Sequence, residues 1–433
     1  MNLINSLRGT CDILPDEIKY WNFIEEKIKN ILLNANYTEI RTPLLEMKEL
    51  FDRGVGQGTD IVNKEMYSFK DQGNREITLR PEGTAGIIRC IIENKLYIQK
   101  PIQKLWYLGP MFRYERPQNG RQRQFNQLGI EYIGSQDARA DTEVINLAYQ
   151  LLNQLEVPEF TLQLNSIGSL EDRSKYKKNL VQYLKRYYLD LDEDSKIRLN
   201  INPLRILDTK EEKTQELLKN APQLCNFLGE NSKRHFEHLC IYLNSLQIPF
   251  KVNQQLVRGL DYYNDTAFEF KTEYLGSQDT ICGGGRYDKL SETLGGPYIP
   301  AIGWAIGIER LLLLVKQKVL LSEARLDFYI VSENSVRCKI ESIVLLNEII
   351  NKGFKAELDT TDASLRKKIS RSYKFYSTHC IIIGEKEITT NKVTIKELQN
   401  NMQFTITREK FMKLYCTKTC QAINTLVTAK NQI

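Results

Sequence analysis

Two short segments of the chain contain the residues best suited to chemistry. The segment LRPEGTA sets Glu82 and Thr84 on either side of a glycine, and the segment FRYERPQNGRQRQFNQLGIE begins with four closely spaced arginines around Glu115. A guanidinium group can bind phosphate and carboxylate oxygens through two parallel hydrogen bonds, which an ammonium group cannot do. This density of arginine therefore predicts a site for anionic substrates.

The second segment also predicts a β-hairpin. If strands flank the turn at Pro117–Gly120, Arg113 projects from the first strand, and the alternation of side chains places Gln127 and Glu131 on one face of the second. One concave face would then carry both signs of charge. The alternative is a surface hairpin of compensating Glu and Arg pairs, which the YERP sequence disfavours.

A glycine cluster and a tyrosine pair indicate a site only when their flanking residues are considered. GGG alone marks a turn or a close backbone approach, but here it begins GGGRYD at Gly283–Asp288. A tyrosine pair alone is most simply part of a core in a chain with 22 tyrosines, but here it ends RGLDYY at Arg258–Tyr263. A Walker phosphate loop is absent, so a nucleotide site would be of another type.

Metal and disulfide chemistry are not expected. His235 and His238 lie on a predicted helix near Cys240, but zinc needs about four ligands and this group offers three at most. The nine cysteines are scattered without a Cys-x-x-Cys pair, which favours a reducing compartment over a disulfide framework. We therefore predict no metal site and place the two histidines at a surface or an interface.

Three regions of the chain differ in their pattern. Residues 1–165 mix helical periodicity, as at Ile18–Asn34, with strand-like runs; residues 170–245 are strongly helical and charged; strand patterns return at Thr266–Phe270. After a polar connection the chain alternates DFYIV, ESIVLLNEIINKG and CIIIG, which is typical of a mixed sheet with helices. The sequence therefore predicts an α+β domain over 1–322, with a helical insertion at about 170–245, and an α/β domain over 323–433.

The positive charge is concentrated in the last quarter of the chain. The net charge is +6, and residues 323–433 contain 18 Lys and Arg against 12 Asp and Glu, so the first 322 residues sum to zero. Arg366, Lys367, Lys368 and Arg371 partly share one face of a predicted helix, which indicates a polyanionic partner such as nucleic acid. A solvated basic surface explains the net charge alone equally well.

Composition excludes several other classes of protein. Hydrophobic residues are 42% and charged residues 26%, as in ordinary globular proteins, and no run approaches the roughly 20 apolar residues of a membrane span. The segment MNLINSLRGT resembles neither a signal peptide nor a transit peptide. We therefore expect no membrane association and a cytoplasmic location, or the plastid stroma if the gene is encoded in that organelle.

These motifs resemble those of class II aminoacyl-tRNA synthetases, in the histidyl form. FRYERPQNGRQRQFNQLGIE is similar to motif 2, AIGWAIGIERL at Ala301–Leu311 to motif 3, and RTPLLE at Arg41–Glu46 to motif 1. RGTCDILPDE and LVRGLDYYNDTAFEF resemble segments specific to the histidyl enzymes. The resemblance spans essentially the whole chain, with a departure at Asp265, where we expect a basic or neutral residue.

The resemblance implies a fold, a reaction and an assembly. The fold would be the antiparallel sheet of class II synthetases flanked by helices, with the helical insertion and a C-terminal α/β anticodon-binding domain. The reaction would be ATP-dependent ligation of L-histidine to tRNA(His) through a histidyl-adenylate, with Mg²⁺ carried on the ATP. The assembly would be a homodimer whose interface uses the region Asn22–Pro43.

The resemblance also implies roles for individual residues. Arg113 and Arg258 would be catalytic, since they would offset the repulsion between the carboxylate of histidine and the α-phosphate of ATP. The histidine site would comprise Glu82, Gly83, Thr84, Arg113, Gln127, Glu131, Arg258, Tyr262 and Tyr263. The ATP site would comprise Arg113, Glu115, Arg121 and Arg310. The residues that contact tRNA would be Gln118, Arg123, Arg366, Lys367, Lys368 and Arg371.

Two alternatives of other classes share this resemblance. One is a catalytically idle paralogue that regulates the phosphoribosyltransferase opening histidine biosynthesis, and the other is a tRNA-binding or signalling relative. The first typically lacks the anticodon domain and departs from the histidine-specific motif, and the second would lose motif arginines. RGLDYY, Arg113 and Arg310 are all present here, so we expect histidine-dependent exchange between pyrophosphate and ATP, which both alternatives should fail.

Overall fold

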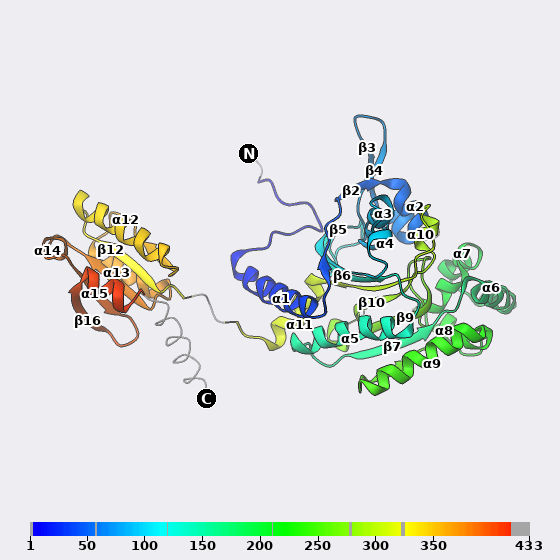
Figure 1. The fold of residues 1–433 in the computed structure, drawn as a ribbon. Coiled ribbons are helices and arrows are strands. Elements are labelled where there is room, and N and C mark those ends of the chain that lie inside the picture. The colour runs from blue at the N-terminus through cyan, green and yellow to red at the C-terminus, as the bar shows by residue number, and fades with distance from the viewer. Residues whose placement is uncertain are drawn as a thin grey trace. The chain divides into compact units, whose positions relative to one another are not determined.

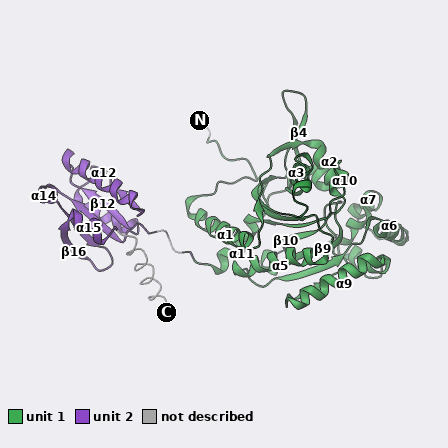
Figure 2. Ribbon diagram, viewed as in Figure 1, with its two compact units in different colours: residues 1–320 green, residues 321–433 purple. Residues whose placement is uncertain are grey.

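The computed structural model describes residues 3–56, 59–118, 120–209, 211–276, 279–321 and 325–416. The chain divides into two compact units, residues 1–320 and 321–433 (Figure 2). Within the described ranges, no helix is both long enough and apolar enough to cross a membrane.

An eight-stranded sheet forms the centre of the first unit (Figure 1). The six central strands pair antiparallel, and a short parallel strand is added at each edge. The predicted antiparallel sheet is therefore confirmed in its centre. The order of the strands is β1 (Thr38–Glu39), β5 (Gln103–Phe112), β6 (Gln124–Ile133), β11 (Ala301–Gly307), β10 (Thr280–Arg286), β9 (Asn264–Lys271), β7 (Thr161–Ser166) and β8 (Phe250–Val252).

One face of this sheet is covered by helices that bury an apolar core. The alternation of side chains along β5 and β6 turns Trp106, Leu128 and Ile130 toward this core. Helix α1 contributes apolar residues at every third or fourth position, as in Ile24, Ile28 and Ile31, which is why its sequence forms an amphipathic helix. The helices of this core are α1 (Pro15–Asn34), α5 (Ala138–Gln154), α9 (Glu230–Ser245) and α11 (Ile308–Lys318).

The second face of the sheet meets smaller elements. Ile87, Ile88 and Ile91 of one of these helices share an apolar cluster with Tyr107 of β5. A three-stranded antiparallel sheet of order β2–β4–β3 lies beside them. The elements here are β2 (Leu45–Met47), α2 (Lys48–Gly54), η1 (Ile61–Glu65), β3 (Tyr67–Lys70), β4 (Glu76–Leu79), α3 (Thr84–Glu93), α4 (Leu96–Gln99) and α10 (Leu290–Thr293), while η5 (Glu273–Leu275) follows β9.

The segment between β7 and β8 is helical throughout. Two of its helices begin at side-chain caps: Ser169 and Asp172 form a capping box, and Asp192 accepts a hydrogen bond from the amide of Ser195 at 2.8 Å. The segment contains α6 (Leu170–Lys185), η2 (Tyr188–Asp190), α7 (Glu193–Ile201), η3 (Pro203–Asp208), α8 (Glu212–Leu218), η4 (Leu224–Phe227) and α9. We call this segment the helical insertion.

The second unit is a five-stranded mixed sheet with helices. Its order is β13 (Ala356–Leu358), β12 (Phe328–Ser332), β14 (His379–Ile383), β15 (Lys392–Glu397) and β16 (Met402–Thr407). The first three strands are parallel and the last two pair antiparallel, which confirms the predicted mixed sheet. Its helices are α12 (Val336–Asn351), α13 (Leu365–Lys374), α14 (Glu385–Thr389) and α15 (Arg408–Leu414).

Candidate active site

A cleft of about 780 Å³ opens in the first unit, where β6, β10 and β11 meet loops from distant parts of the chain. Arg113, Arg258 and Arg310 all line it. Guanidinium groups from three separate segments therefore meet in one cavity. The residues of the predicted histidine and ATP sites that line the cleft are Glu82, Thr84, Arg113, Glu115, Arg121, Gln127, Arg258, Tyr262, Tyr263 and Arg310.

Three arginines, Arg113, Arg121 and Arg310, lie close together at one end of the cleft, with Glu115 among them. Arg310 donates hydrogen bonds to the carbonyl oxygens of Gly120 at 3.1 Å and Thr280 at 2.9 Å, which are neutral groups. Burial lowers the pKa of Arg310, and the charges of Arg121 and Arg113 lower it further, although the carboxylates of Glu115 and Asp279 oppose this shift. This end is therefore suited to a polyanion, because phosphate oxygens would relieve the repulsion among the arginines.

The hairpin of β5 and β6 forms around the predicted turn, but Arg113 does not project from the first strand itself. Arg113 lies one residue beyond β5, and its Nε donates to the carbonyl oxygen of Pro81 at 2.8 Å. Its guanidinium lies 5.2 Å from the ring centroid of Phe125, a cation–π contact. On β6, Gln127 and Glu131 share the face that the cleft occupies, which confirms the period-two expectation.

Two buried carboxyl groups lie close together here. Glu82 lines the cleft, whereas Glu131 and Gly83 of the predicted histidine site are not part of its lining. Glu82 accepts hydrogen bonds from the amides of Thr84 at 2.6 Å and Ala85 at 2.8 Å, in the first turn of α3. Glu131 accepts hydrogen bonds from Thr84 Oγ1 at 2.8 Å and from the hydroxyl of Tyr287. Burial raises the pKa of Glu82, and it raises the pKa of Glu131 to about 8 although these two hydrogen bonds oppose it. Such a pocket is suited to a small polar donor.

Four tyrosines surround these carboxyl groups. The rings of Tyr262 and Tyr263 lie 4.7 Å apart, and Tyr287 meets Tyr262 edge-on at 5.7 Å. A Cβ at Gly83 would lie 2.4 Å from the ring of Tyr107, so only glycine fits beside this ring. The sequence analysis missed Tyr107, because no local pattern distinguishes it. It assigned no role to Tyr287, although this residue is the tyrosine of the GGGRYD motif.

Arg258 reaches the cleft from the loop between β8 and β9. Its Nη1 donates to Glu269 of β9, and its guanidinium lies 5.6 Å from the ring centroid of Tyr263. Its Nε is buried and has no hydrogen-bond partner among the residues that the structure describes. A Cβ at Gly283 would lie 2.4 Å from Nη2, so the glycine-rich strand makes room for this side chain. Glu269 lies within the segment LVRGLDYYNDTAFEF, but the sequence alone does not identify it as the partner of Arg258.

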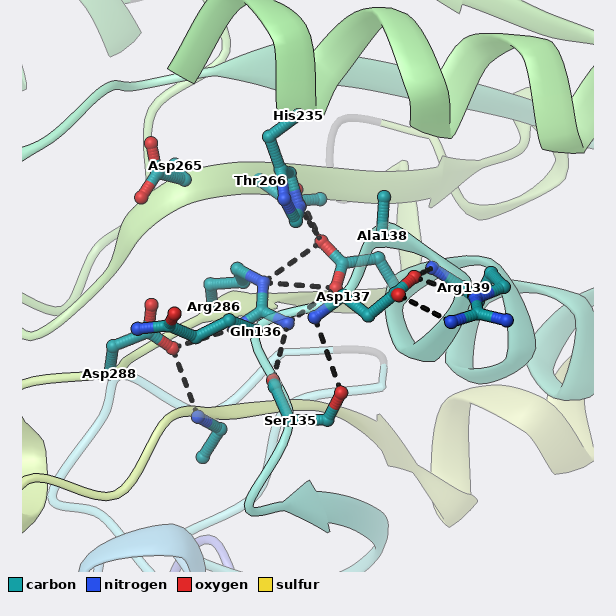
Figure 3. Close-up of polar contacts among 12 residues, drawn as sticks. Ser135, Gln136, Asp137, Ala138, Arg139, His235, Asp265, Thr266, Arg286 and Asp288 are labelled. Carbon is teal, nitrogen blue, oxygen red and sulfur yellow. Dashed lines mark hydrogen bonds and ion pairs between the residues drawn. The ribbon is translucent and has the colours of Figure 1, made fainter. Parts of the chain in front are cut away.

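A buried cluster of charged groups ties the helical insertion to the sheet (Figure 3). Asp141 of α5 accepts hydrogen bonds from Arg286 Nε at 2.9 Å and Thr266 Oγ1 at 2.6 Å, and its Oδ2 lies 2.7 Å from His235 Nε2. Arg286 also pairs with Asp288 at 2.8 Å. Burial raises the pKa of Asp141, but Arg286 and His235 lower it by more, so the pKa lies below its ordinary value. His235 therefore serves an internal interface between α9 and the sheet.

Asp265, the departure from the family pattern, belongs to the same interface. Its backbone has a φ of 45°, a conformation that Asp tolerates better than most residues. Its carboxylate accepts hydrogen bonds from Ser232 Oγ of α9 at 2.6 Å and from Asn264 Nδ2 at 2.8 Å. Asp265 therefore has hydrogen-bond partners at this interface and is not among the residues that line the cleft.

The predicted tRNA contacts at the turn of the hairpin are not part of the cleft lining. Gln118 forms a bridge with Arg121 across the turn. Arg123 stacks on Tyr114, with its guanidinium carbon 3.7 Å from the ring centroid. The turn therefore lies beside the cleft, and its contact with tRNA stays a prediction.

The structure corrects one predicted tRNA contact in the second unit. Lys368 is 1% exposed, and its ammonium donates to the carbonyl oxygen of Ser332 at 2.8 Å and to Asn334 Oδ1 at 2.9 Å. The prediction that Lys368 contacts tRNA is wrong, because this face of α13 packs against the sheet. Arg366 and Lys367 are exposed.

A mainly antiparallel sheet with arginines and an acidic, tyrosine-lined pocket in one cleft, joined to a separate α/β unit, defines a class II aminoacyl-tRNA synthetase. The family model of histidyl-tRNA synthetase matches residues 9–311, and the anticodon binding domain model matches residues 329–415. The chain belongs to the histidyl-tRNA synthetase family.

Relatives and solved structures agree. The chain is 55% identical to the chloroplastic histidine–tRNA ligase of Gracilaria tenuistipitata var. liui, over 94% of this chain and 96% of that protein. It is 51% identical to the histidine–tRNA ligase of a Cyanothece species, over 93% of this chain and 94% of that protein. The structure of apo S. aureus histidyl-tRNA synthetase matches with a TM-score of 0.81 and 35% identity, covering 96% of this chain and 100% of that one.

Proposed function

We propose that this cleft forms histidyl-adenylate from L-histidine and ATP and then transfers the histidyl group to tRNA(His). The family activity is the ATP-dependent charging of tRNA(His) with histidine. The observation that carries the assignment is the convergence of Arg113, Arg258 and Arg310 on one cavity that the buried carboxyl group of Glu82 also lines. The match to the anticodon-binding model favours the ligase over an idle regulatory paralogue.

The arginines would make the first step possible by electrostatics. A carboxylate oxygen of histidine attacks the α-phosphorus of ATP and pyrophosphate leaves, so two anions must meet. Arg113 and Arg258 would lie against the nonbridging oxygens, which gain charge in the transition state. Although burial lowers it, the pKa of Arg258 is raised on balance, first by the charge of Glu269. Arg258 therefore stays protonated and acts as a cation, not as a base.

The acidic pocket would select histidine. Glu131 and Tyr263 would bond to the two imidazole nitrogens, and an apolar side chain of similar size would leave these buried groups unpaired. Glu82 has both oxygens engaged with backbone amides, but each oxygen can accept a second hydrogen bond from the α-ammonium group. The remaining residues of the proposed histidine site are Gly83, Thr84, Gln127 and Tyr262.

The arginine-rich end of the cleft would hold ATP. Arg310, Arg121 and Arg113 would bind the phosphates through their free guanidinium nitrogens. Glu115 has one oxygen, Oε2, that is buried and has no hydrogen-bond partner in the described part of the chain, although Arg121 lies 3.1 Å away. This oxygen fits the Mg²⁺ that would arrive with the phosphates, since Mg²⁺ prefers carboxylate ligands.

Two further parts of the chain would bind tRNA. Gln118 and Arg123 at the hairpin turn would meet the acceptor end beside the cleft. In residues 323–433, the proposed anticodon-binding domain, Arg366 and Lys367 would meet phosphates directly. Arg371 pairs with Asp359 at 3.1 Å, so its guanidinium would bind tRNA with part of its charge already compensated.

Assembly and location complete the proposal. We propose a homodimer that uses the region Asn22–Pro43 and the adjoining apolar surface, where Leu44, Leu45, Met47 and Phe69 are each more than two-fifths exposed. Because a 55% identical relative is named chloroplastic, the plastid stroma is the favoured location over the cytoplasm. Sedimentation of the purified protein and fractionation of the source cells test these two points.

The test of the reaction is histidine-dependent exchange of labelled pyrophosphate into ATP. R113Q and R258Q should each lower kcat/KM about 100-fold to 1000-fold, the typical loss for one preorganised donor. R186Q changes an exposed arginine of the helical insertion and should leave the exchange unchanged. Full exchange by R113Q and R258Q, or exchange that does not depend on histidine, would overturn the assignment.

A further inference from the structure

The loop that carries Arg258 has little structure of its own. Residues 253–263 connect β8 to β9 without a helix or strand, yet they supply Arg258, Tyr262 and Tyr263 to the cleft. Ordering such a loop costs conformational entropy, and polar backbone groups within it need partners. The conformation of this loop therefore depends on contacts from other elements.

The helical insertion supplies two of these contacts. Arg205 Nη2 donates to the carbonyl oxygen of Gly259 at 3.1 Å, and Asn202 Nδ2 donates to Asp261 Oδ1 at 2.7 Å. Both donors lie at the beginning of η3, where Pro203 sets the first turn and the amide of Arg205 bonds to the carbonyl oxygen of Asn202 at 3.1 Å. The insertion therefore holds the loop immediately after Arg258.

The same arginine also reaches a second wall of the cleft. Arg205 Nη1 lies 3.1 Å from Asp60 Oδ2, directly before η1. Asp60, Arg205 and Gly259 all line the cleft, so one guanidinium joins two of its walls. The side chain of Arg205 is 18% exposed, which limits competition from water for these contacts.

We propose that Asn202 and Arg205 are positioning residues for histidine binding. They act through the loop 253–263, whose orientation aims Arg258 and the tyrosine pair at the amino acid. This inference rests on the proposed histidine site. Arg113, Arg121 and Arg310, proposed to hold ATP, belong to the hairpin and α11 and receive no contact from these two residues. Loss of the contacts therefore weakens histidine binding and spares ATP binding.

The first test measures KM for each substrate in pyrophosphate exchange by the full-length protein. R205A raises KM for histidine about tenfold, equivalent to ~1.4 kcal/mol, and leaves KM for ATP within about twofold. R205K keeps a cation beside Asp60 but loses the planar fork that joins two acceptors, so its KM for histidine lies between wild type and R205A. R186Q, on the same insertion, changes neither KM.

A second test keeps the inference falsifiable if R205A folds poorly. N202D sets a carboxylate against that of Asp261 and raises KM for histidine, because like charges would meet at hydrogen-bond distance. The double variant N202D/D261N restores a hydrogen bond with donor and acceptor exchanged, and KM for histidine returns toward the wild-type value. A merely destabilised protein would not be rescued in this way.

The outcomes separate this inference from the proposed function. A wild-type KM for histidine in R205A, or an equal rise of both KM values, overturns the positioning role, as does a failure of N202D/D261N to recover. If R258Q loses exchange while R205A behaves as wild type, only the positioning role fails. If R258Q retains full exchange, the proposed site itself fails.

Discussion

Glu131 offers the sharpest test of the histidine pocket, because its ionisation should appear in the pH dependence of the reaction. Burial raises its pKa to about 8 in the unliganded protein. In its proposed role, the Glu131 carboxylate accepts a hydrogen bond from an imidazole N–H of the substrate. The ionised form of Glu131 therefore binds histidine best. The pH dependence of kcat/KM reports ionisation of the free enzyme and free substrate.

The size of the effect follows from that pKa. A carboxyl group with a pKa near 8 is ionised in about a tenth of the molecules at pH 7 and in about half at pH 8. The kcat/KM for histidine in pyrophosphate exchange should therefore rise about fivefold over this interval. E131Q cannot ionise, so it should show no such rise and should be about tenfold less active at pH 8, since it has lost a charge-assisted hydrogen bond.

The control is the same pH series for kcat/KM of ATP at saturating histidine, where occupancy of the pocket removes the free carboxyl group. Histidine itself also titrates, but it does so identically in assays of wild type and E131Q. A rise in E131Q with the wild-type midpoint would assign the titration to another group. A flat wild-type profile between pH 7 and 8 would refute the reasoning.

The raised pKa of Glu131 also predicts how stability depends on pH. The folded protein retains this proton up to about pH 8, whereas the unfolded chain releases it near the ordinary glutamate pKa of 4.5. Between these values the folded state binds more protons, so this group lowers the free energy of unfolding as pH rises. Thermal melts should show wild type losing stability relative to E131Q from pH 5 to pH 8. A constant difference would contradict the assignment.

Three further outcomes follow from the structure. Changing Asp141 to Asn should lower the free energy of unfolding by ~3–5 kcal/mol, because it removes the carboxylate beside His235 and one of the two that pair with buried Arg286. Thermal melts measure this loss, and an unchanged midpoint would contradict it. R366Q/K367Q should weaken tRNA binding and flatten its salt dependence without changing pyrophosphate exchange, and an equal loss of exchange would refute the assignment. K368M should instead lower the free energy of unfolding by ~1–3 kcal/mol, because it leaves buried acceptors unpaired. A melting temperature equal to that of the wild type would refute this prediction.

Several local features could be predicted from the sequence. The hairpin that presents Arg113 follows from the alternation of side chains around a turn, and α1 follows from apolar residues at helical spacing. The anion-binding chemistry was also visible, because arginines needed for phosphate lie close together in the chain. Such features depend on neighbours within a few positions, which the sequence displays directly.

Contacts between distant segments could not be predicted in the same way. Tyr107 meets Gln127 across the hairpin at 3.4 Å, and Arg258 pairs with Glu269. The contact of Arg205 with the loop of Arg258 joins the helical insertion to the histidine side of the cleft. None of these partners carries a local signal, because an arginine or tyrosine on a helix or strand has the same sequence pattern whichever element it meets.

By itself, the sequence determined the family, the broad alternation of helical and strand-like regions, and the kinds of charge that the cleft contains. Only the tertiary structure decided which of several similar cations are available to a ligand. Arg366, Lys367 and Lys368 are consecutive, but the packing of α13 on β12 buries the last one against the carbonyl oxygen of Ser332. Burial depends on what a helix face meets, and that partner comes from another part of the chain.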